Sequence, residues 1–526
     1  MSEKDGQPEI AMVDDVKGES PEHQLLENER HVGLWKAAMS NKTLLLHCTA
    51  AFFAGMVFGY DSIVNGASIS MPAFLIYFGA EAQDGSRYLP SLWTALWTSM
   101  SALLQALGGL GIGVVSDKIG RKWCCILACL VSVVGVGMQY AAESRGLLLG
   151  GKMVNGLAIG CLTASSTSWA SEISTVRLRG PIQSAIVLFT VLMQAIGLAV
   201  IRTYADDMTE HSFRMVFVIQ FVWPVATAII FFIMPESPVF LILHNKLDQA
   251  KRTLTRIHGS KDDVDTRLSV LQAEIERERE SAVSGDAGSY LEAFSGSNRK
   301  RSLTVVWLFV GVGLNGGVLL SQNVYFLIIA GLEPIHSYDI AIGGFGLAFL
   351  AIIVSWFYME SFGRRSLWLI GTVGNILVMG AIGGLYYSKS DGALWAIAIL
   401  MNVLIAWQVV TMTSIGWVIT AEISTYRLRG KTQSIAVVSA AFASWFFTFT
   451  VPYIYNTDSG NLGARTGFVF MGSSIVLLIG SYFLVPELQG FTRDEIDLLY
   501  AKGIRVREFH KYKDGGSRDD PSCVSP

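Results

Sequence analysis

Two stretches of this chain, 250 positions apart, carry nearly the same thirteen residues. The first reads Glu172-Ile-Ser-Thr-Val-Arg-Leu-Arg-Gly-Pro-Ile-Gln-Ser184, and the second reads Glu422-Ile-Ser-Thr-Tyr-Arg-Leu-Arg-Gly-Lys-Thr-Gln-Ser434. Ten of the thirteen positions are identical. A repeat of this kind indicates an architecture made by duplication. We therefore expect two halves built to one plan.

The composition of the chain is typical of a membrane protein. Of its 526 residues, 51% are hydrophobic and 16% are charged, whereas an ordinary soluble domain has about 25% charged residues. The net charge of -3 gives no reason to expect a nucleic-acid partner. Five of the six cysteines lie within apolar runs, and their spacing predicts neither a disulfide framework nor a metal site.

Twelve apolar segments are long enough to span a bilayer, which takes about 20 helical residues. They lie near residues 44–66, 91–115, 123–142, 147–170, 182–203, 214–234, 303–328, 338–359, 367–387, 393–420, 432–455 and 466–485. Six precede a charged central block and six follow it. The sequence therefore predicts an all-α membrane protein with twelve transmembrane helices in two six-helix lobes.

The charged residues of the short loops predict the orientation in the membrane. Lys and Arg gather after segments 2, 4, 8 and 10, and the loops on the other side are richer in acids. Because excess Lys and Arg mark the cytoplasmic side, both termini and the central block are expected in the cytoplasm. The expected units are a tail at 1–43, a first lobe at 44–234, a linker at 235–302, a second lobe at 303–486 and a tail at 487–526.

The central block has the apolar period of amphipathic helices, with Leu247, Ala250, Leu254 and Ile257 in its first run. The alternative for residues 259–300 is a disordered loop, because a stretch near 281–289 is rich in Ser and Gly. Both tails are expected to be disordered. No cleavable signal peptide is expected, since residues 1–43 lack an apolar core.

Charged residues are duplicated at the expected cytoplasmic ends of the helices. The basic residues of one short loop in each half can pair with the acid that begins each copy of the repeat. The candidate gate residues are Asp117, Arg121, Glu172 and Arg179 in the first half and Glu360, Arg364, Glu422 and Arg429 in the second. A two-fold set suits a gate that closes in one state and opens in another. The alternative is a plain basic cap without a moving role.

These stretches, together with Pro-Glu-Ser-Pro at 235–238 and Pro-Glu-Leu-Gln-Gly at 486–490, resemble the signatures of the sugar porter family of the major facilitator superfamily. The stretch 491–500 resembles the fungal members, particularly the maltose and general alpha-glucoside permeases. The likeness covers roughly residues 44–503. It implies two lobes around a mid-membrane site, alternating access, a carbohydrate solute and a monomer.

Two ionisable residues within the apolar segments are the candidates for proton coupling, because such residues are costly in a membrane and are functional by default. Asp61 matches the acid that proton-coupled sugar porters have at the end of segment 1. Lys152 stands in segment 4, where those relatives have arginine, and it keeps the charge without the rigid bidentate fork. The alternatives are a static helix-end acid and a lysine that reaches the outer surface.

Aromatic and amide side chains are the candidate solute ligands, since sugars offer apolar ring faces and many hydroxyls. By the resemblance, Trp417 on segment 10 and Gln194 on segment 5 match residues that contact sugar in the family. The alternative for both is an ordinary packing role. Gln408 lies at membrane depth on segment 10 and is a further candidate. Its alternative is a hydrogen bond between helices.

Segment 7 departs from the family pattern. Val312, Gly313 and Val318 stand where hexose and pentose porters carry amides, and Gln322 and Asn323 are the remaining amide pair. We take the missing amides as an argument against a simple hexose. An oligosaccharide such as an alpha-glucoside is the favoured solute.

The sequence therefore predicts a proton-coupled importer of a sugar or sugar-like solute, multi-pass in the plasma membrane. An exporter or carrier of a non-sugar metabolite is the alternative with the same fold. A non-transporting nutrient sensor is less favoured, because such sensors resemble transporters with long C-terminal extensions and only 26 residues follow Tyr500. No enzyme, metal or cofactor is expected, since no catalytic constellation or metal-ligand spacing is visible.

Overall fold

The computed structural model describes residues 34–512, apart from the segments 82–86, 260–263, 284–289, 359–362, 425–427 and 457–458 and the positions 297, 330, 389, 490 and 492. The described chain is helical except for one two-stranded hairpin, β1 (Ala80–Glu81) with β2 (Arg87–Tyr88). Eleven continuous stretches of it are long and apolar enough to cross a membrane. The predicted all-α membrane fold is confirmed.

The first lobe contains the first six predicted segments. They correspond to α3 (Lys42–Ala67), α5 (Ser91–Ile119), α6 (Arg121–Tyr140), α7 (Arg145–Ile173), α8 (Val176–Tyr204) and the pair α9 (Glu210–Gln220) and α10 (Val222–Ile233). The sixth helix is interrupted at Phe221. Pro224 has no N–H to donate to the carbonyl of Gln220, so the proline accounts for the interruption at this point.

The second lobe contains the last six segments, of which the first is not a single helix. They correspond to α15 (Asn298–Leu314), α16 (Gly317–Ser321) and α17 (Asn323–Ile329), then α18 (Pro334–Tyr358), α19 (Arg364–Leu385), α20 (Asp391–Gln408) with α21 (Ser414–Ile423), α22 (Arg429–Tyr455) and α23 (Thr466–Leu484). The expectation of one helix over 303–328 is therefore wrong. Gly316 has a φ of +78°, a left-handed conformation that glycine adopts without steric cost, and it breaks the segment.

A second irregularity lies in the tenth segment. Between α20 and α21 the residues Val409–Thr413 form a π-helical turn. Such turns are rare and often lie at functional sites. Thus two neighbouring segments of the second lobe depart from regular helix, and α16 packs against α20 beside this turn.

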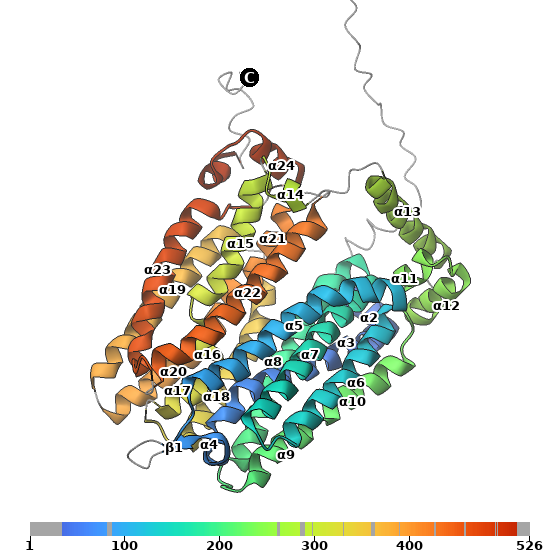
Figure 1. Ribbon diagram of the computed structural model, residues 1–526. Helices are drawn as coiled ribbons and strands as arrows, with labels where there is room; N and C mark the ends of the chain where they lie inside the picture. The colour runs from blue at the N-terminus through green and yellow to red at the C-terminus, as the bar shows by residue number, and fades with distance from the viewer. Residues whose placement is uncertain are drawn as a thin grey trace, which may run out of the picture.

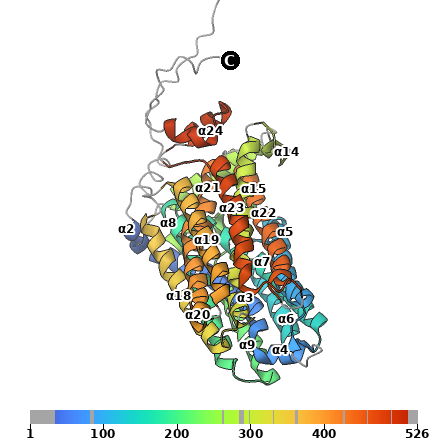
Figure 2. The ribbon, with the colours of Figure 1, turned by 90° about the vertical axis from the view of Figure 1, so that its left-hand side faces the viewer.

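The two lobes lie side by side and have distinguishable ends (Figures 1 and 2). We call the end with β1 and β2 the hairpin end. The opposite end carries α11 (Pro238–Leu243), α12 (Leu247–His258), α13 (Val264–Val283), α14 (Tyr290–Ala293) and α24 (Arg493–Ala501), and we call it the linker end. Between the lobes α5 packs against α22 and α8 against α18. The ribbons of the lobes diverge toward the linker end (Figure 1).

Side-chain contacts join the lobes at the hairpin end. Ser70 and Tyr338 share a hydrogen bond of 2.8 Å, and Asn456 donates to Ser91 at 3.0 Å. Arg202 and Asp339 form a two-bond ion pair across the same end. A single apolar cluster there contains side chains of both lobes, whereas two further clusters nearer the linker end each belong to one lobe. The lobes are thus closed at the hairpin end.

At the linker end, the prediction of helices in the linker is confirmed, and the prediction of a disordered C-terminal tail is corrected. The predicted linker helices are present as α12 and α13, and α13 replaces the alternative of a disordered loop over residues 264–283. The expectation of a disordered C-terminal tail is wrong for the described residues 493–512, which contain α24 and a 3₁₀ helix, Val506–Tyr512. Ile496, Leu499 and Tyr500 supply an apolar stripe that packs on the second lobe. Residues 1–33 of the N-terminal tail lie outside the described part.

Candidate functional site

Asp61 lies on α3 in the interior of the first lobe and is 7% exposed. Two amide groups donate to the same oxygen of its carboxylate, Oδ1: Asn155 Nδ2 at 2.5 Å and Gln220 Nε2 at 2.9 Å. Ser132 in turn donates to Asn155 Oδ1 at 2.6 Å. The carboxylate is therefore held by a hydrogen-bond network that joins α3, α6, α7 and α9.

Lys152 lies on α7 and is 2% exposed. Its ammonium donates to Asn65, at 2.8 Å to the side-chain oxygen Oδ1 and at 3.2 Å to the backbone oxygen. Both Lys152 and Asp61 are described, and their charged atoms lie farther apart than the 4.0 Å of an ion pair. Lys152 of α7 thus contacts Asn65, which lies one turn of α3 beyond Asp61.

The sequence analysis missed Asn65 and Gln220. Asn65 follows Asp61 by four positions, so the two side chains lie on the same face of one helix. That spacing is a signal that could have been used. Gln220 carried no comparable signal, because its contact with Asp61 depends on how α9 packs against α3.

The predicted aromatic and amide ligands of the solute lie in different lobes. Gln194 on α8 donates to Ser62, the neighbour of Asp61, at 3.4 Å. Trp417 on α21 is 38% exposed, and its ring packs edge-on against Phe309 of α15 at 4.5 Å between ring centres. The structure therefore places Gln194 beside the Asp61 network and leaves Trp417 accessible in the second lobe.

Gln322 and Asn323 lie at the junction of α16 and α17, and both are buried. Tyr455 donates its hydroxyl to Gln322 Oε1 at 2.8 Å. Asn323 Nδ2 donates to Asn402 Oδ1 on α20 at 3.3 Å. In this conformation both amides are hydrogen-bonded within the second lobe.

Gln408 belongs to a buried amide cluster around the break in segment 7. Its Nε2 donates to Asn375 Oδ1 at 2.6 Å and to the backbone oxygen of Asn315 at 3.0 Å. Asn375 Nδ2 also donates to Asn315 O at 3.0 Å and to Ser474 Oγ at 2.8 Å. A broken helix leaves buried carbonyls without helical donors, and these amides supply them. The geometry agrees with the alternative that Gln408 bonds helices to one another.

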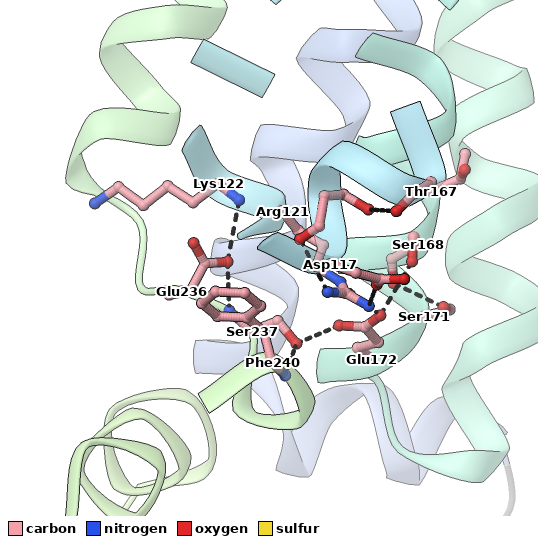
Figure 3. Close-up of polar contacts among 12 residues, drawn as sticks. Asp117, Arg121, Lys122, Thr167, Ser168, Ser171, Glu172, Glu236, Ser237 and Phe240 are labelled. Atoms are coloured by element: carbon pink, nitrogen blue, oxygen red, sulfur yellow. Dashed lines mark hydrogen bonds and ion pairs between the residues drawn. The ribbon is translucent and has the colours of Figure 1, made fainter. Parts of the chain in front are cut away.

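A charged cluster of the first lobe lies at the linker end (Figure 3). Arg121 forms ion pairs with Glu172 at 3.1 Å and with Asp117 at 3.0 Å. Glu172 also accepts hydrogen bonds from Ser168 at 3.0 Å and from Ser237. We call these five residues the first charged cluster. Arg121 and Glu172 come from the two motifs that were expected to pair.

The predicted residue Arg179 lies outside this arrangement of ion pairs. It follows the repeat acid by seven positions, and its guanidinium donates to the backbone oxygen of Ser171 at 3.1 Å. This bond joins the start of α8 to the end of α7. The structure therefore places Arg179 near the first charged cluster as a link between helix ends.

The second lobe carries a related pairing. Arg364 and Glu422 form an ion pair of 3.3 Å, which we call the second charged cluster. Leu488 occupies the place of Ser237 after the matching proline and glutamate, and it has no hydroxyl to donate. Of the other predicted gate residues, Glu360 and the side chain of Arg429 lie outside the described part of the chain.

Beside each cluster a glutamate that the sequence analysis did not select caps a membrane helix. Glu236 Oε1 accepts from the backbone N–H of Lys122 at 3.0 Å, and Glu487 Oε1 accepts from the N–H of Arg364 at 2.9 Å. Helix starts present unpaired N–H groups and the positive end of the helix dipole, so each carboxylate stabilises its helix. The two caps occupy matching places at the starts of α6 and α19.

The glycine before each capped helix makes room for the glutamate. A Cβ on Gly120 would lie 2.3 Å from Glu236 Oε2, and a Cβ on Gly363 would lie 2.3 Å from Glu487 Oε2. Burial raises the pKa of Glu236 above its usual range, and its backbone hydrogen bonds counteract part of that rise. The repeated Pro-Glu at 235–236 and 486–487 was the sequence signal for this pair.

The comparisons with known proteins agree with this geometry. Residues 47–500 match the sugar (and other) transporter family. The chain belongs to this family. The sugar (and other) transporter family thus covers all the membrane helices described here except the first residues of α3.

Members of the family and solved structures resemble the chain over most of its length. It is 39% identical to the MFS transporter fmqE of Aspergillus fumigatus over 93% of each chain, and 24% identical to the general alpha-glucoside permease of Saccharomyces cerevisiae, over 86% of this chain and 74% of the permease. The inward-open xylose transporter XylE from E. coli gives a TM-score of 0.66 at 18% identity, over 87% of this chain and 99% of XylE. A partially occluded inward-open form of XylE gives 0.68 at 17% identity, over 86% of this chain and all 100% of that one. These structures establish a major facilitator fold.

Proposed function

We propose that this transporter couples solute movement to protons and that Asp61 is the proton-binding group. The observation that carries the proposal is a buried carboxylate, held at one oxygen by two amides and one turn away from a buried ammonium. An acid at membrane depth is stable only with partners of this kind, and such an acid is functional by default. Proton binding and release at Asp61 change the charge next to Lys152.

We propose that the transporter works by alternating access, with the linker end in the cytoplasm. Contacts between the lobes at the hairpin end and separate apolar clusters nearer the linker end support an inward-facing state. The two charged clusters are then gate elements on the cytoplasmic side, where basic residues accumulate. In this proposal the protein acts as a monomer in the plasma membrane.

The proposed solute is a carbohydrate, with an alpha-glucoside favoured over a simple hexose. The names of the maltose and alpha-glucoside permeases among the relatives support a carbohydrate. Trp417 offers an accessible aromatic face, and Gln194 offers an amide near Asp61. An aromatic plate and an amide are the groups that a sugar ring and its hydroxyls require.

A non-sugar metabolite is the second candidate solute, and a packing observation favours it. A Cβ on Gly313 would lie 2.0 Å from Phe447 Cδ2, so a phenyl ring of α22 fills the space of any side chain at that position. Position 313 is one of those where hexose and pentose porters carry an amide. The relative with 39% identity has a name that specifies no sugar. An apolar ring in place of an amide is better suited to a less polar solute.

The experiment is an uptake screen in host cells that lack their own sugar transporters. Labelled maltose, glucose, a polyol and a panel of aromatic metabolites are supplied at acidic and at neutral external pH, with and without a proton uncoupler. We expect pH-dependent accumulation of at least one solute, abolished by the uncoupler and by Asp61→Asn. Asp206→Asn, an exposed acid at the hairpin end, is the matched control. Uptake that is insensitive both to the uncoupler and to Asp61→Asn would exclude the coupling mechanism.

A further inference from the structure

The contact between Lys152 and Asn65 lies one helical turn from the proposed proton site. Asp61 and Asn65 are four positions apart on α3, so their side chains are separated by about 6 Å along the helix axis. Lysine carries its charge on a flexible four-carbon stem. The Lys152 ammonium can therefore move between these two partners without movement of the helices.

The second lobe has the same contact without the charge. Lys152 precedes the repeat acid Glu172 by 20 positions, and Asn402 precedes Glu422 by 20 positions. Just as Lys152 donates to Asn65 near the end of α3, Asn323 of segment 7 donates to Asn402. The duplicated frame thus places Lys152 and Asn402 at matching positions, and each is hydrogen-bonded to an asparagine of the first segment of its lobe. Only the first lobe has an ionisable residue there, and only there can the contact respond to a proton.

We propose that Asn65 is a positioning residue for proton coupling. It holds the Lys152 ammonium while Asp61 carries a proton, and it returns the ammonium to Asp61 once the proton has left. Lys152 stays protonated throughout, and the proton moves between Asp61 and water on either side of the membrane. The inference rests on the proposed proton coupling at Asp61.

The surroundings of the two charged residues agree with this role. Among the described residues, Asp61 is the group that acts on Lys152 by its charge, and Lys152 is the group that acts on Asp61 in that way. Asn155 and Gln220 both donate to Asp61 Oδ1, and no hydrogen bond to Oδ2 occurs within the described part of the chain. Oδ2 is thus the oxygen for the proton. A buried ammonium without a partner is strongly unfavourable, so Lys152 needs Asn65 whenever Asp61 is neutral.

The test compares Asn65→Asp, Asn65→Gln and the matched control Asn41→Asp, which makes the same change at the linker end of the same helix. Asn65→Asp gives Lys152 a permanent ionic partner and should keep it from Asp61. We expect accumulation against a gradient to fall by about tenfold or more and the pH profile of uptake to flatten. Exchange of labelled for unlabelled solute should remain within about threefold of the unmodified protein. Asn65→Gln keeps the amide and should retain the pH profile.

Two outcomes separate this inference from the proposed function. If Asp61→Asn abolishes coupling but Asn65→Asp leaves the pH profile unchanged, the role of Asn65 is overturned and the proton site stands. If Asp61→Asn leaves the coupling intact, the proposed function itself fails. Gel filtration of each variant establishes folding. If Asn65→Asp does not fold, Asn65→Ala replaces it, and an unchanged pH profile in that variant overturns the inference equally.

Discussion

The fourth helices of the two lobes present different chemistry at matching positions. In the first lobe Lys152 donates to Asn65, and in the second lobe Asn402 accepts from Asn323. The packing of the fourth helix against the first has therefore been kept after duplication, while the charge is confined to one lobe. Matching positions in the two lobes need not have the same function, because the energy of the contact between the first and fourth helices depends on whether one partner can ionise.

The surroundings of these contacts extend the difference. The first lobe holds a carboxylate between two amide donors, whereas the second lobe uses the amides of Gln408 and Asn375 to satisfy the carbonyl of Asn315 at a helix break. Irregular backbone at membrane depth is tolerated where other groups satisfy it. In the proposed mechanism the first lobe responds to protons, whereas the amides of the second lobe hold a broken helix.

The largest expected effect comes from placing a charge in the second lobe. Asn402→Lys puts an ammonium at a site that is 5% exposed. Without a carboxylate nearby it should lower the free energy of unfolding by about 3–5 kcal/mol. The neutral control Asn402→Leu loses the hydrogen bond from Asn323 and the one that Asn402 donates to the backbone oxygen of Ala398, and it should cost only about 1–2 kcal/mol. Thermal unfolding in detergent measures both. Equal stability of the two variants would mean that the second lobe accepts a charge as readily as the first.

The two charged clusters provide the next comparison. The side chains of Arg121 and Glu172 are 9% and 14% exposed, against 21% and 31% for Arg364 and Glu422. We therefore expect Arg121→Ala to lower the free energy of unfolding by about 3 kcal/mol, and Arg364→Ala by about 1 kcal/mol. Lys251→Ala, in an exposed ion pair with Asp265, is the control and should change little. An equal or greater loss in Arg364→Ala would contradict the ranking.

Gln408→Leu should affect stability without affecting coupling. The change removes both hydrogen bonds of the amide and leaves Asn375 Oδ1 without this donor, at a cost of about 1–3 kcal/mol. The pH profile of uptake should not change, because the cluster is neutral. Chemical unfolding and uptake at several pH values test the two statements, with Gln183→Leu near the linker end as the control. A shifted pH profile would show that the second lobe takes part in proton coupling.

The smallest expected effect at neutral pH concerns the helices docked at the linker end. Burial, and then the charges of Arg267 and His47, lower the pKa of His258 on α12 to about 4 from its usual 6.5. A neutral imidazole in the folded state contributes stability that is complete above pH 6.5 and is lost as the pH falls toward 4, by up to roughly 3 kcal/mol. Hydrogen exchange of α12 should therefore accelerate on acidification more than that of α24.

His258→Gln provides the control for this last prediction. The glutamine cannot take up a proton, so the acid sensitivity of α12 should disappear while its exchange at neutral pH stays within a few fold. If α12 of the unmodified protein exchanges no faster in acid once the intrinsic pH effect is removed, the docking of α12 does not depend on His258.

The helices and charged motifs could be predicted from the sequence because their signals are local. Apolar runs of sufficient length gave the membrane segments, and the duplicated motifs gave the pairing of Arg121 with Glu172 and of Arg364 with Glu422. Asp61 and Lys152 could also be selected from the sequence as ionisable residues within membrane segments. The membrane segments needed only residue type and spacing along the chain, whereas Asp61 and Lys152 also needed the resemblance to the sugar porters.

The missed features depend on contacts between helices. Asn65 and Gln220 reach the charged residues only through the relative placement of α3, α7 and α9. The residues on both sides of the break at Gly316 are apolar, so hydropathy alone predicted one continuous segment. The packing of α24 on the second lobe was not predicted, because charged residues surround the apolar stripe that contains Ile496 and Leu499.

The apolar cluster that both lobes share at the hairpin end has a calorimetric consequence. It includes Phe74 of the first lobe and Tyr338 and Tyr455 of the second, all fully buried. If that end opens during the proposed cycle, part of this surface meets water, and exposure of apolar surface raises the heat capacity. The equilibrium between the two states of the transporter should then curve with temperature, so the rate of transport should not follow a straight Arrhenius line even where the membrane itself is unchanged.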